Sequence, residues 1–197
     1  MLKYIEIDGI MKRYLTAVIL FTMILPGCRT GKTVVENRSS GGLTTEKQAD
    51  INYSDPVTWL LGYINPLQFS KPPHSEWFQK GFNEYQPVGE IIGKLAQLNK
   101  DDLTIRIVLG TWCPDSRREV PRFMKIMDLM QFPPEKVIFV GVDNTKIAPV
   151  GGYDTLRIER VPTFIILKNK VETGRIIENP VTSLEQDILN ILTGNEN

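Results

Sequence analysis

The chain has 197 residues, of which 42% are hydrophobic and 23% are charged. This length and composition suit one ordinary globular domain with a tail. Lysine plus arginine and aspartate plus glutamate number 23 each, and the sequence has no basic run or aromatic–basic stripe. These features argue against a nucleic-acid partner and against attraction to anionic lipid by charge.

The first 28 residues have the pattern of an export signal. Met11-Lys12-Arg13 gives a positive start, and residues 15–25 are almost wholly apolar. That run is too short to span a membrane comfortably, but it suits the hydrophobic region of a secretory signal. Glu6 and Asp8 do not suit a basic leader, so either Met1 or Met11 could be the start of translation.

The run ends in Leu25-Pro26-Gly27-Cys28, which resembles the lipobox of bacterial lipoproteins, with Pro26 as an unusual third member. The resemblance implies lipid on Cys28 and a protein anchored in the bacterial cell envelope, facing the periplasm or the surface. A plain signal peptide, or an uncleaved anchor with an unmodified Cys28, stays open. Residues 29–52 are rich in Ser, Thr, Gly and charge, which predicts a flexible tether.

Only two cysteines are present, Cys28 and Cys113. If Cys28 carries lipid, Cys113 is the single free thiol of the mature protein and no intrachain disulfide can form. We therefore expect its partners to be disulfide-bearing exported proteins or small oxidised thiols, together with an external reducing thiol. Because His74 is the only histidine, we expect no metal site, and no cofactor is predicted.

Residues 53–86 carry several aromatic side chains among prolines. We expect an irregular N-terminal extension whose aromatic residues pack on the main domain; a partner-binding surface is the alternative. The aromatic residues concerned include Trp59, Tyr63, Phe69, Trp77, Phe78 and Phe82.

Residues 87–197 alternate between apolar residues at helical spacing and short β-rich runs, which predicts an α/β domain. Pro121 is expected to kink the second helix, and the spacing of Thr182 and Glu185 suggests a capping box at the last one. The predicted helices are 88–98, 114–130 and one beginning near 182; the predicted strands are 103–109, 137–142, 163–167 and 171–177.

Cys113 lies in Trp112-Cys113-Pro114-Asp115-Ser116, between a predicted strand and a predicted helix. A thiol reacts as its thiolate, and the unpaired N–H groups at a helix start favour that anion. Pro114 suits the first helical turn. Arg117 and Arg118 add positive charge, whereas Asp115 opposes it. Trp112 would shield the sulfur on one side and offer a flat contact to a partner chain.

This motif, followed by Pro121 and then by Val161-Pro162-Thr163, is similar to the thioredoxin superfamily over roughly residues 87–192. The resemblance implies a three-layer α/β sandwich with a central mixed sheet. It also implies a cis peptide bond before Pro162, in a loop beside the reactive sulfur that presents backbone groups to an extended substrate. Trp112, Pro114, Val161 and Pro162 are therefore the expected substrate-binding residues.

Two positions depart from the family pattern. Ser116 stands where dithiol members have the second, resolving cysteine, and Ile107 stands where thioredoxins commonly place a buried acid. Both departures fit a thiol–disulfide oxidoreductase with one cysteine, which forms mixed disulfides that an outside thiol resolves. Cys113 is then the nucleophile, and the Ser116 hydroxyl helps to steady its thiolate.

Other interpretations stay open. The chain could be a non-catalytic binding or scaffold module with an inert buried Cys113, or a thiol peroxidase that reacts through sulfenic acid. Ser116 could be a polar residue of the first helical turn and nothing more. A nucleophilic pair between Cys113 and His74 is the least favoured arrangement, because the two are far apart in sequence.

Overall fold

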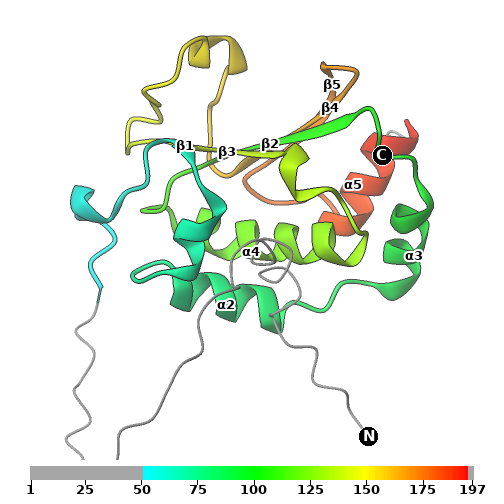
Figure 1. Ribbon diagram of the computed structural model, residues 1–197, viewed down its shortest axis with the longest axis horizontal. Helices are drawn as coiled ribbons and strands as arrows, with labels where there is room; N and C mark the ends of the chain where they lie inside the picture. The colour runs from blue at the N-terminus through cyan, green and yellow to red at the C-terminus, as the bar shows by residue number, and fades with distance from the viewer. Residues whose placement is uncertain (1–50, 195–197) are drawn as a thin grey trace, which may run out of the picture. The chain divides into compact units, whose positions relative to one another are not determined.

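The computed structural model describes residues 51–194, which form an α/β fold with a five-stranded sheet and four α-helices (Figure 1). The predicted export signal, Cys28 and nearly all of the predicted tether lie outside the described residues. The strands are β1 (Gly62–Ile64), β2 (Leu103–Leu109), β3 (Val137–Gly141), β4 (Thr163–Lys168) and β5 (Val171–Ile177). The helices are α2 (Ser75–Glu84), α3 (Gly89–Gln97), α4 (Pro114–Leu129) and α5 (Leu184–Thr193). The short 3-10 turns are η1 (Pro56–Thr58), η2 (Pro66–Ser70), η3 (Pro134–Lys136) and η4 (Tyr153–Leu156).

The sheet has the strand order β1-β3-β2-β4-β5. Strands β2 and β3 are parallel and all other neighbours are antiparallel, so the sheet is mixed, as predicted. The β4–β5 hairpin turns at Asn169 and Lys170, which both have positive φ angles (53° and 66°). Strand β2, with the central place in the sheet, carries apolar residues toward both faces, which explains why its sequence reads as a continuous apolar run.

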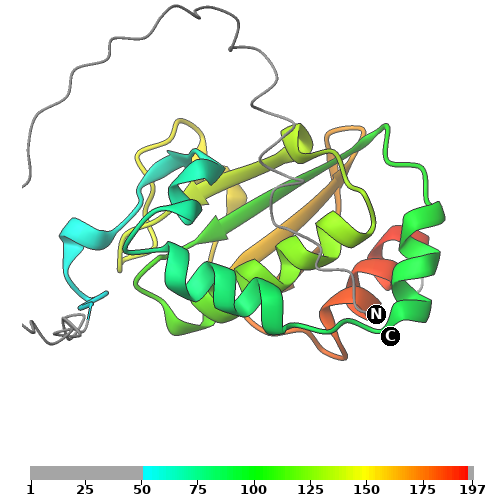
Figure 2. The same ribbon diagram turned by 60° about the horizontal axis from the view of Figure 1, so that its bottom comes forward.

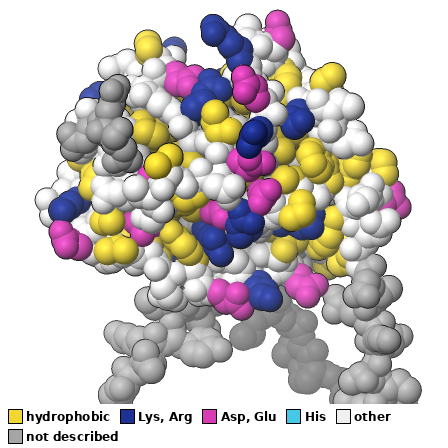
Figure 3. Space-filling view, turned by 180° about the vertical axis from the view of Figure 1, so that it is seen from behind, with side chains coloured by type: hydrophobic (Ala, Val, Ile, Leu, Met, Phe, Trp, Pro, Cys, Tyr) yellow, Lys and Arg dark blue, Asp and Glu magenta, His cyan; other side chains and the backbone are white. Residues whose placement is uncertain are grey.

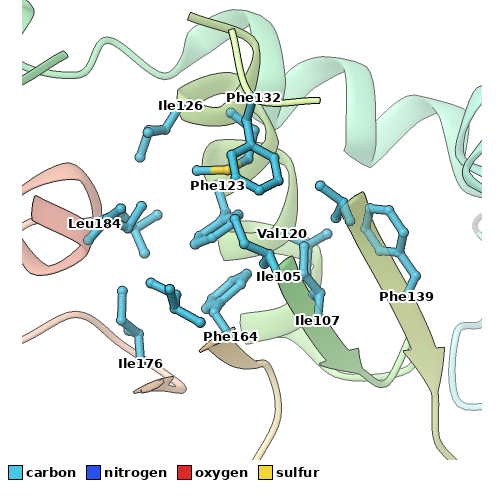
Figure 4. Close-up of a cluster of buried hydrophobic side chains, with 14 of the residues drawn as sticks. Ile105, Ile107, Val120, Phe123, Ile126, Phe132, Phe139, Phe164, Ile176 and Leu184 are labelled. Carbon is cyan, nitrogen blue, oxygen red and sulfur yellow. The ribbon is translucent and has the colours of Figure 1, made fainter. Parts of the chain in front are cut away.

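One face of the sheet packs on helices α4 and α5, with α2 on the far side of α4 (Figures 1 and 2). At the centre of this core the rings of Phe123 and Phe164 stack with centroids 4.3 Å apart (Figure 4). Ile107, where a buried acid is common in thioredoxins, has no exposed surface in this core. An ionised side chain here would lack solvent, so the apolar residue avoids a large desolvation cost.

The opposite face of the sheet is covered by the long connection between β3 and β4, residues 142–162, which holds η4 (Figure 1). Val108, Val140 and Ile165 point into this second core from three adjacent strands. The connection thus covers this face of the sheet. The last residues of the connection, Val161 and Pro162, lie next to the start of α4.

The predicted irregular extension contains two regular elements that the sequence analysis missed. Strand β1 pairs antiparallel with β3 at the edge of the sheet, and helix α2 packs against α4. A Cβ atom on Gly81 of α2 would lie 2.5 Å from Pro121 Cγ, so glycine permits this close approach. Strand β1 has only three residues and gives no clear periodic signal, whereas α2 is amphipathic but follows a Pro-rich stretch that favoured an irregular prediction.

Helix α5 begins one residue later than the predicted capping box. Ser183 is the N-cap, and its hydroxyl accepts a hydrogen bond from the Gln186 N–H. Glu185 is 2% exposed and binds other partners: it accepts from the Tyr85 hydroxyl at 2.7 Å and from the Val88 N–H at 3.1 Å. The carboxylate therefore ties α5 to the segment between α2 and α3.

Replacing Glu185 with glutamine is expected to lower the free energy of unfolding by about 1–3 kcal/mol at pH 7, because the amide keeps only one of the two oxygens that accept hydrogen bonds from Tyr85 and Val88. Burial alone would raise the pKa of Glu185, but the Tyr85 and Val88 hydrogen bonds hold it below 4.5. Its contribution to stability is thus complete above pH 4.5 and is lost as the pH falls further. Urea unfolding of both proteins between pH 3 and 7 measures this, and an equal acid sensitivity in the variant would contradict it.

No helix within residues 51–194 is long and apolar enough to cross a bilayer. On the face that Figure 3 shows, acidic and basic side chains lie next to one another among apolar ones. Several of the described charges are paired, for example Arg160 with Glu178 and Lys94 with Glu90, both at 2.8 Å.

Candidate active site

Cys113 is the N-cap residue of α4, directly after the turn that ends β2. Its N–H donates to the Gly110 carbonyl at 2.9 Å, and its carbonyl accepts from the Arg117 N–H at 3.1 Å. Pro114 occupies the first helical turn, where a backbone N–H would have no hydrogen-bond acceptor within the helix, so its absence costs no hydrogen bond. The predicted placement of the thiol at a helix start is therefore confirmed. Cys113 is only 7% exposed, however, so it is less open than the sequence analysis expected.

The sulfur of Cys113 contacts the loop that precedes β4. Its S–H donates to the Val161 carbonyl oxygen with a sulfur–oxygen distance of 3.3 Å. The Val161–Pro162 peptide bond is cis, and both residues are buried. The structure thus brings together three of the predicted site residues, Cys113, Val161 and Pro162, from segments 48 residues apart.

Trp112 and Pro114 flank the cysteine. The Trp112 indole is half-buried and donates from Nε1 to the Val142 carbonyl at 3.0 Å, so its ring is fixed to the end of β3. A Cβ atom on Gly110 would lie 2.5 Å from this ring, which leaves room only for glycine. Pro114 is exposed. Next to Cys113, the Trp112 ring is therefore fixed in place, whereas Pro114 is accessible.

Ser116 is fully buried, and its hydroxyl oxygen accepts a hydrogen bond from the Gly110 N–H at 3.3 Å. Among residues 51–194 no hydrogen bond joins this hydroxyl to the Cys113 sulfur. The contact secures the turn between β2 and α4. The expected role of Ser116 at the sulfur stays a prediction.

The charges on the first turns of α4 divide into two groups. Asp115 pairs with Arg118 at 2.7 Å, so its negative charge is largely offset. Arg117 instead folds back and donates from Nη1 to the carbonyls of Thr111 (2.9 Å) and Trp112 (2.8 Å). Burial lowers the pKa of Arg117, while the neighbouring Tyr53 and Cys113 act in the opposite direction. The guanidinium thus lies against the two carbonyls that directly precede Cys113.

The N-terminal arm, residues 51–60, also contacts the site, which was not predicted from the sequence. The Thr111 hydroxyl donates to the Thr58 carbonyl at 3.3 Å and accepts from the Leu60 N–H at 3.2 Å. The Trp59 and Trp112 rings lie 6.4 Å apart between centroids. No local motif could have signalled these contacts, because the partners are more than 50 residues apart.

His74, at the N-cap of α2, is 4% exposed and its Nδ1 has no hydrogen-bond partner in the described part of the chain. Burial lowers its pKa, and the charge of Arg117 lowers it further, so the ring is neutral at pH 7. It has no hydrogen bond to Cys113, which leaves the proposed pair of nucleophile and base without geometric support. The described residues contain no group of three or more side chains able to hold a metal ion.

Comparison with known proteins identifies the family. No family model matches the chain. A thioredoxin of Echinococcus granulosus is 30% identical over 82 residues, which cover 42% of this chain and 71% of the relative. The chain belongs to the thioredoxin family.

Two solved structures have a weak similarity to this thioredoxin-family chain. One is a protein of unknown function from Pseudomonas aeruginosa with 15% sequence identity and a TM-score of 0.40. The aligned part covers 61% of this chain and 70% of that protein. The other is an HIV epitope scaffold with 17% sequence identity and a TM-score of 0.38. The aligned part covers 61% of this chain and 73% of the scaffold.

Proposed function

We propose that this thioredoxin-family protein carries out thiol–disulfide exchange through one cysteine, Cys113. The observation that carries the proposal is the placement of the sulfur at the start of α4, 3.3 Å from the Val161 carbonyl. The helix N-terminus favours the thiolate, and the adjacent loop offers backbone groups to an extended partner.

In the first step, the Cys113 thiolate attacks one sulfur of a partner disulfide. A new S–S bond forms, the partner's S–S bond breaks, and its second sulfur leaves as a thiolate. When Cys113 loses its proton, its hydrogen bond to the Val161 carbonyl is lost. That oxygen can then accept an N–H from the bound partner strand.

In the second step, an external thiolate attacks the mixed disulfide and releases the Cys113 thiolate. The partner leaves joined to the external thiol by a new disulfide bond, so one disulfide has been exchanged for another. Among residues 51–194 Cys113 is the only cysteine, so on this proposal the resolving thiol comes from outside the domain. The partners on this proposal are disulfide-bearing exported proteins or small oxidised thiols, with an external reducing thiol.

The proposal includes attachment to the bacterial cell envelope through lipid on Cys28, with the domain facing the periplasm or the cell surface. The sequence Leu25-Pro26-Gly27-Cys28 after an apolar run supports it. Labelling cells with radioactive palmitate tests this part, because the label should follow the native chain and be lost with Cys28→Ser.

A second candidate function is a binding module with an inert thiol. Two observations favour it: Cys113 is 7% exposed, and the Val161 carbonyl stabilises the protonated form of its thiol through the S–H hydrogen bond. On this view the thioredoxin fold serves only to hold a partner.

Reaction with glutathione disulfide at pH 7 separates the two functions, with the same chain unfolded in urea as the reference thiol. We expect the folded protein to form the mixed disulfide about tenfold faster than the unfolded chain, because the folded site favours the thiolate. Both measurements use the chain with Cys28→Ser, and mass spectrometry should find the adduct on that chain but not when Cys113→Ser is added. A folded protein that reacts more slowly than its unfolded chain would favour the binding module.

A further inference from the structure

We infer that Arg117 is a positioning residue for Cys113 and that Tyr53 of the N-terminal arm holds the Arg117 guanidinium in place. The inference deepens the proposed thiol exchange and rests on it. It makes a segment outside the predicted thioredoxin-like domain part of the reactive centre.

The first observation is the position of the Arg117 guanidinium. Its Nη1 donates to two successive carbonyls, those of Thr111 and Trp112, directly before the cysteine. Carbonyl oxygens carry partial negative charge, which would oppose a thiolate on the next residue. A guanidinium bound to both offsets this charge and fixes the turn from which Cys113 projects.

The second observation is that the Tyr53 ring of the arm packs on the guanidinium. The Arg117 Cζ atom lies 4.3 Å from the centroid of the Tyr53 ring, within the range of a cation–π interaction. The Tyr53 hydroxyl donates to the Pro73 carbonyl at 2.7 Å, and the Tyr53 carbonyl accepts from Trp59 Nε1 at 3.0 Å. Tyr53 is therefore held through both its side chain and its backbone.

The surrounding charges agree with this role. The groups that interact electrostatically with Arg117 from other elements are Tyr53 on the arm and His74 before α2; Cys113 does so from the start of α4. Burial raises the pKa of Tyr53, so it is uncharged at pH 7, and Glu76 acts in the same direction. His74 is neutral as well. The guanidinium is thus the positively charged member of this group, and a thiolate on Cys113 would be an anion close to it.

The test is the rate of Cys113 alkylation by iodoacetamide as a function of pH, measured on the full chain carrying Cys28→Ser. With Arg117→Gln we expect the rate at pH 7 to fall about tenfold and the pH of half-maximal rate to rise by about one unit. Arg117→Lys, which keeps the charge, should restore part of the rate. Lys125→Gln is the matched control, because it removes a positive charge from the same helix at a position where the ammonium lies over the Phe82 ring, and it should leave the profile unchanged.

The arm is tested separately. Tyr53→Leu removes the ring and should lower the rate at pH 7 by about threefold, whereas Tyr53→Phe keeps the ring, loses only the hydrogen bond to Pro73 and should lower the rate less. Circular dichroism confirms that each variant is folded. Unchanged pH profiles in Arg117→Gln and Tyr53→Leu would overturn the inference.

Alkylation does not depend on disulfide exchange. A shifted profile in a protein that fails to react with glutathione disulfide would leave the positioning role intact and refute the proposed function. If disulfide exchange is active but the alkylation profile does not respond to Arg117→Gln, the positioning role is refuted and the proposed function stands.

Discussion

Replacing Ser116 with cysteine is expected to shorten the lifetime of a mixed disulfide on Cys113 by at least about 100-fold. Residues 113 and 116 are three apart across the first turn of α4, so their side chains lie on the same side of the helix start. A thiol held there attacks the mixed disulfide intramolecularly, at a very high effective concentration. The partner leaves as a thiol, and an internal disulfide forms in its place.

The measurement is the decay of the glutathione adduct after excess glutathione disulfide has been removed, followed by mass spectrometry. Ser116→Ala is the matched control, since it also removes the hydroxyl that binds the Gly110 N–H but adds no thiol. We expect its adduct to persist as in the native chain. Equal lifetimes in Ser116→Cys and Ser116→Ala would show that position 116 cannot reach the sulfur.

Replacing Gly141 with alanine is expected to lower the free energy of unfolding by about 2–4 kcal/mol, through steric overlap in a packed core. A Cβ atom there would lie 2.7 Å from the Leu60 carbonyl carbon, closer still to its oxygen, and 2.9 Å from Ile64 Cδ1. The Leu60 backbone cannot give way freely, because Gly62 pairs with Gly141 in the β1–β3 ladder. The substitution should therefore separate β1 from the sheet.

Urea unfolding with a matched glycine tests this expectation. Gly93 is exposed in α3 and a Cβ there would meet no atom within 4 Å, so Gly93→Ala should stabilise the protein by about 0.5–1 kcal/mol through helix propensity. Unfolding midpoints that move by the same amount in both variants would contradict the steric argument. Because Leu60 also donates to Thr111, Gly141→Ala should in addition slow the alkylation of Cys113.

Each predicted helix and strand of residues 87–194 appears in the structure within about two residues of its predicted bounds. Those predictions worked because apolar residues at helical spacing and continuous β-rich runs reflect which faces are buried. The prediction was wrong where burial depended on distant partners. The predicted capping box between Thr182 and Glu185 is an example. Glu185 instead accepts a hydrogen bond from Tyr85, 100 residues away.

The candidate site divides in the same way. The sequence by itself determined that one cysteine starts a helix after a buried strand, since the Trp-Cys-Pro motif and the flanking periodicity are local. The Val161–Pro162 loop followed from family resemblance and not from any local signal. Its contact with the sulfur required the β-sheet to bring two segments together.

The tertiary structure alone decided what surrounds that cysteine. In the folded chain Cys113 is 7% exposed, the Ser116 hydroxyl accepts a hydrogen bond from Gly110, and the Tyr53 ring lies against the Arg117 guanidinium. Each of these outcomes depends on side-chain packing between segments far apart in the chain. Local propensity fixes where a helix begins, but charge, burial and hydrogen-bond partners at its first residue are set by whatever the rest of the fold packs against it.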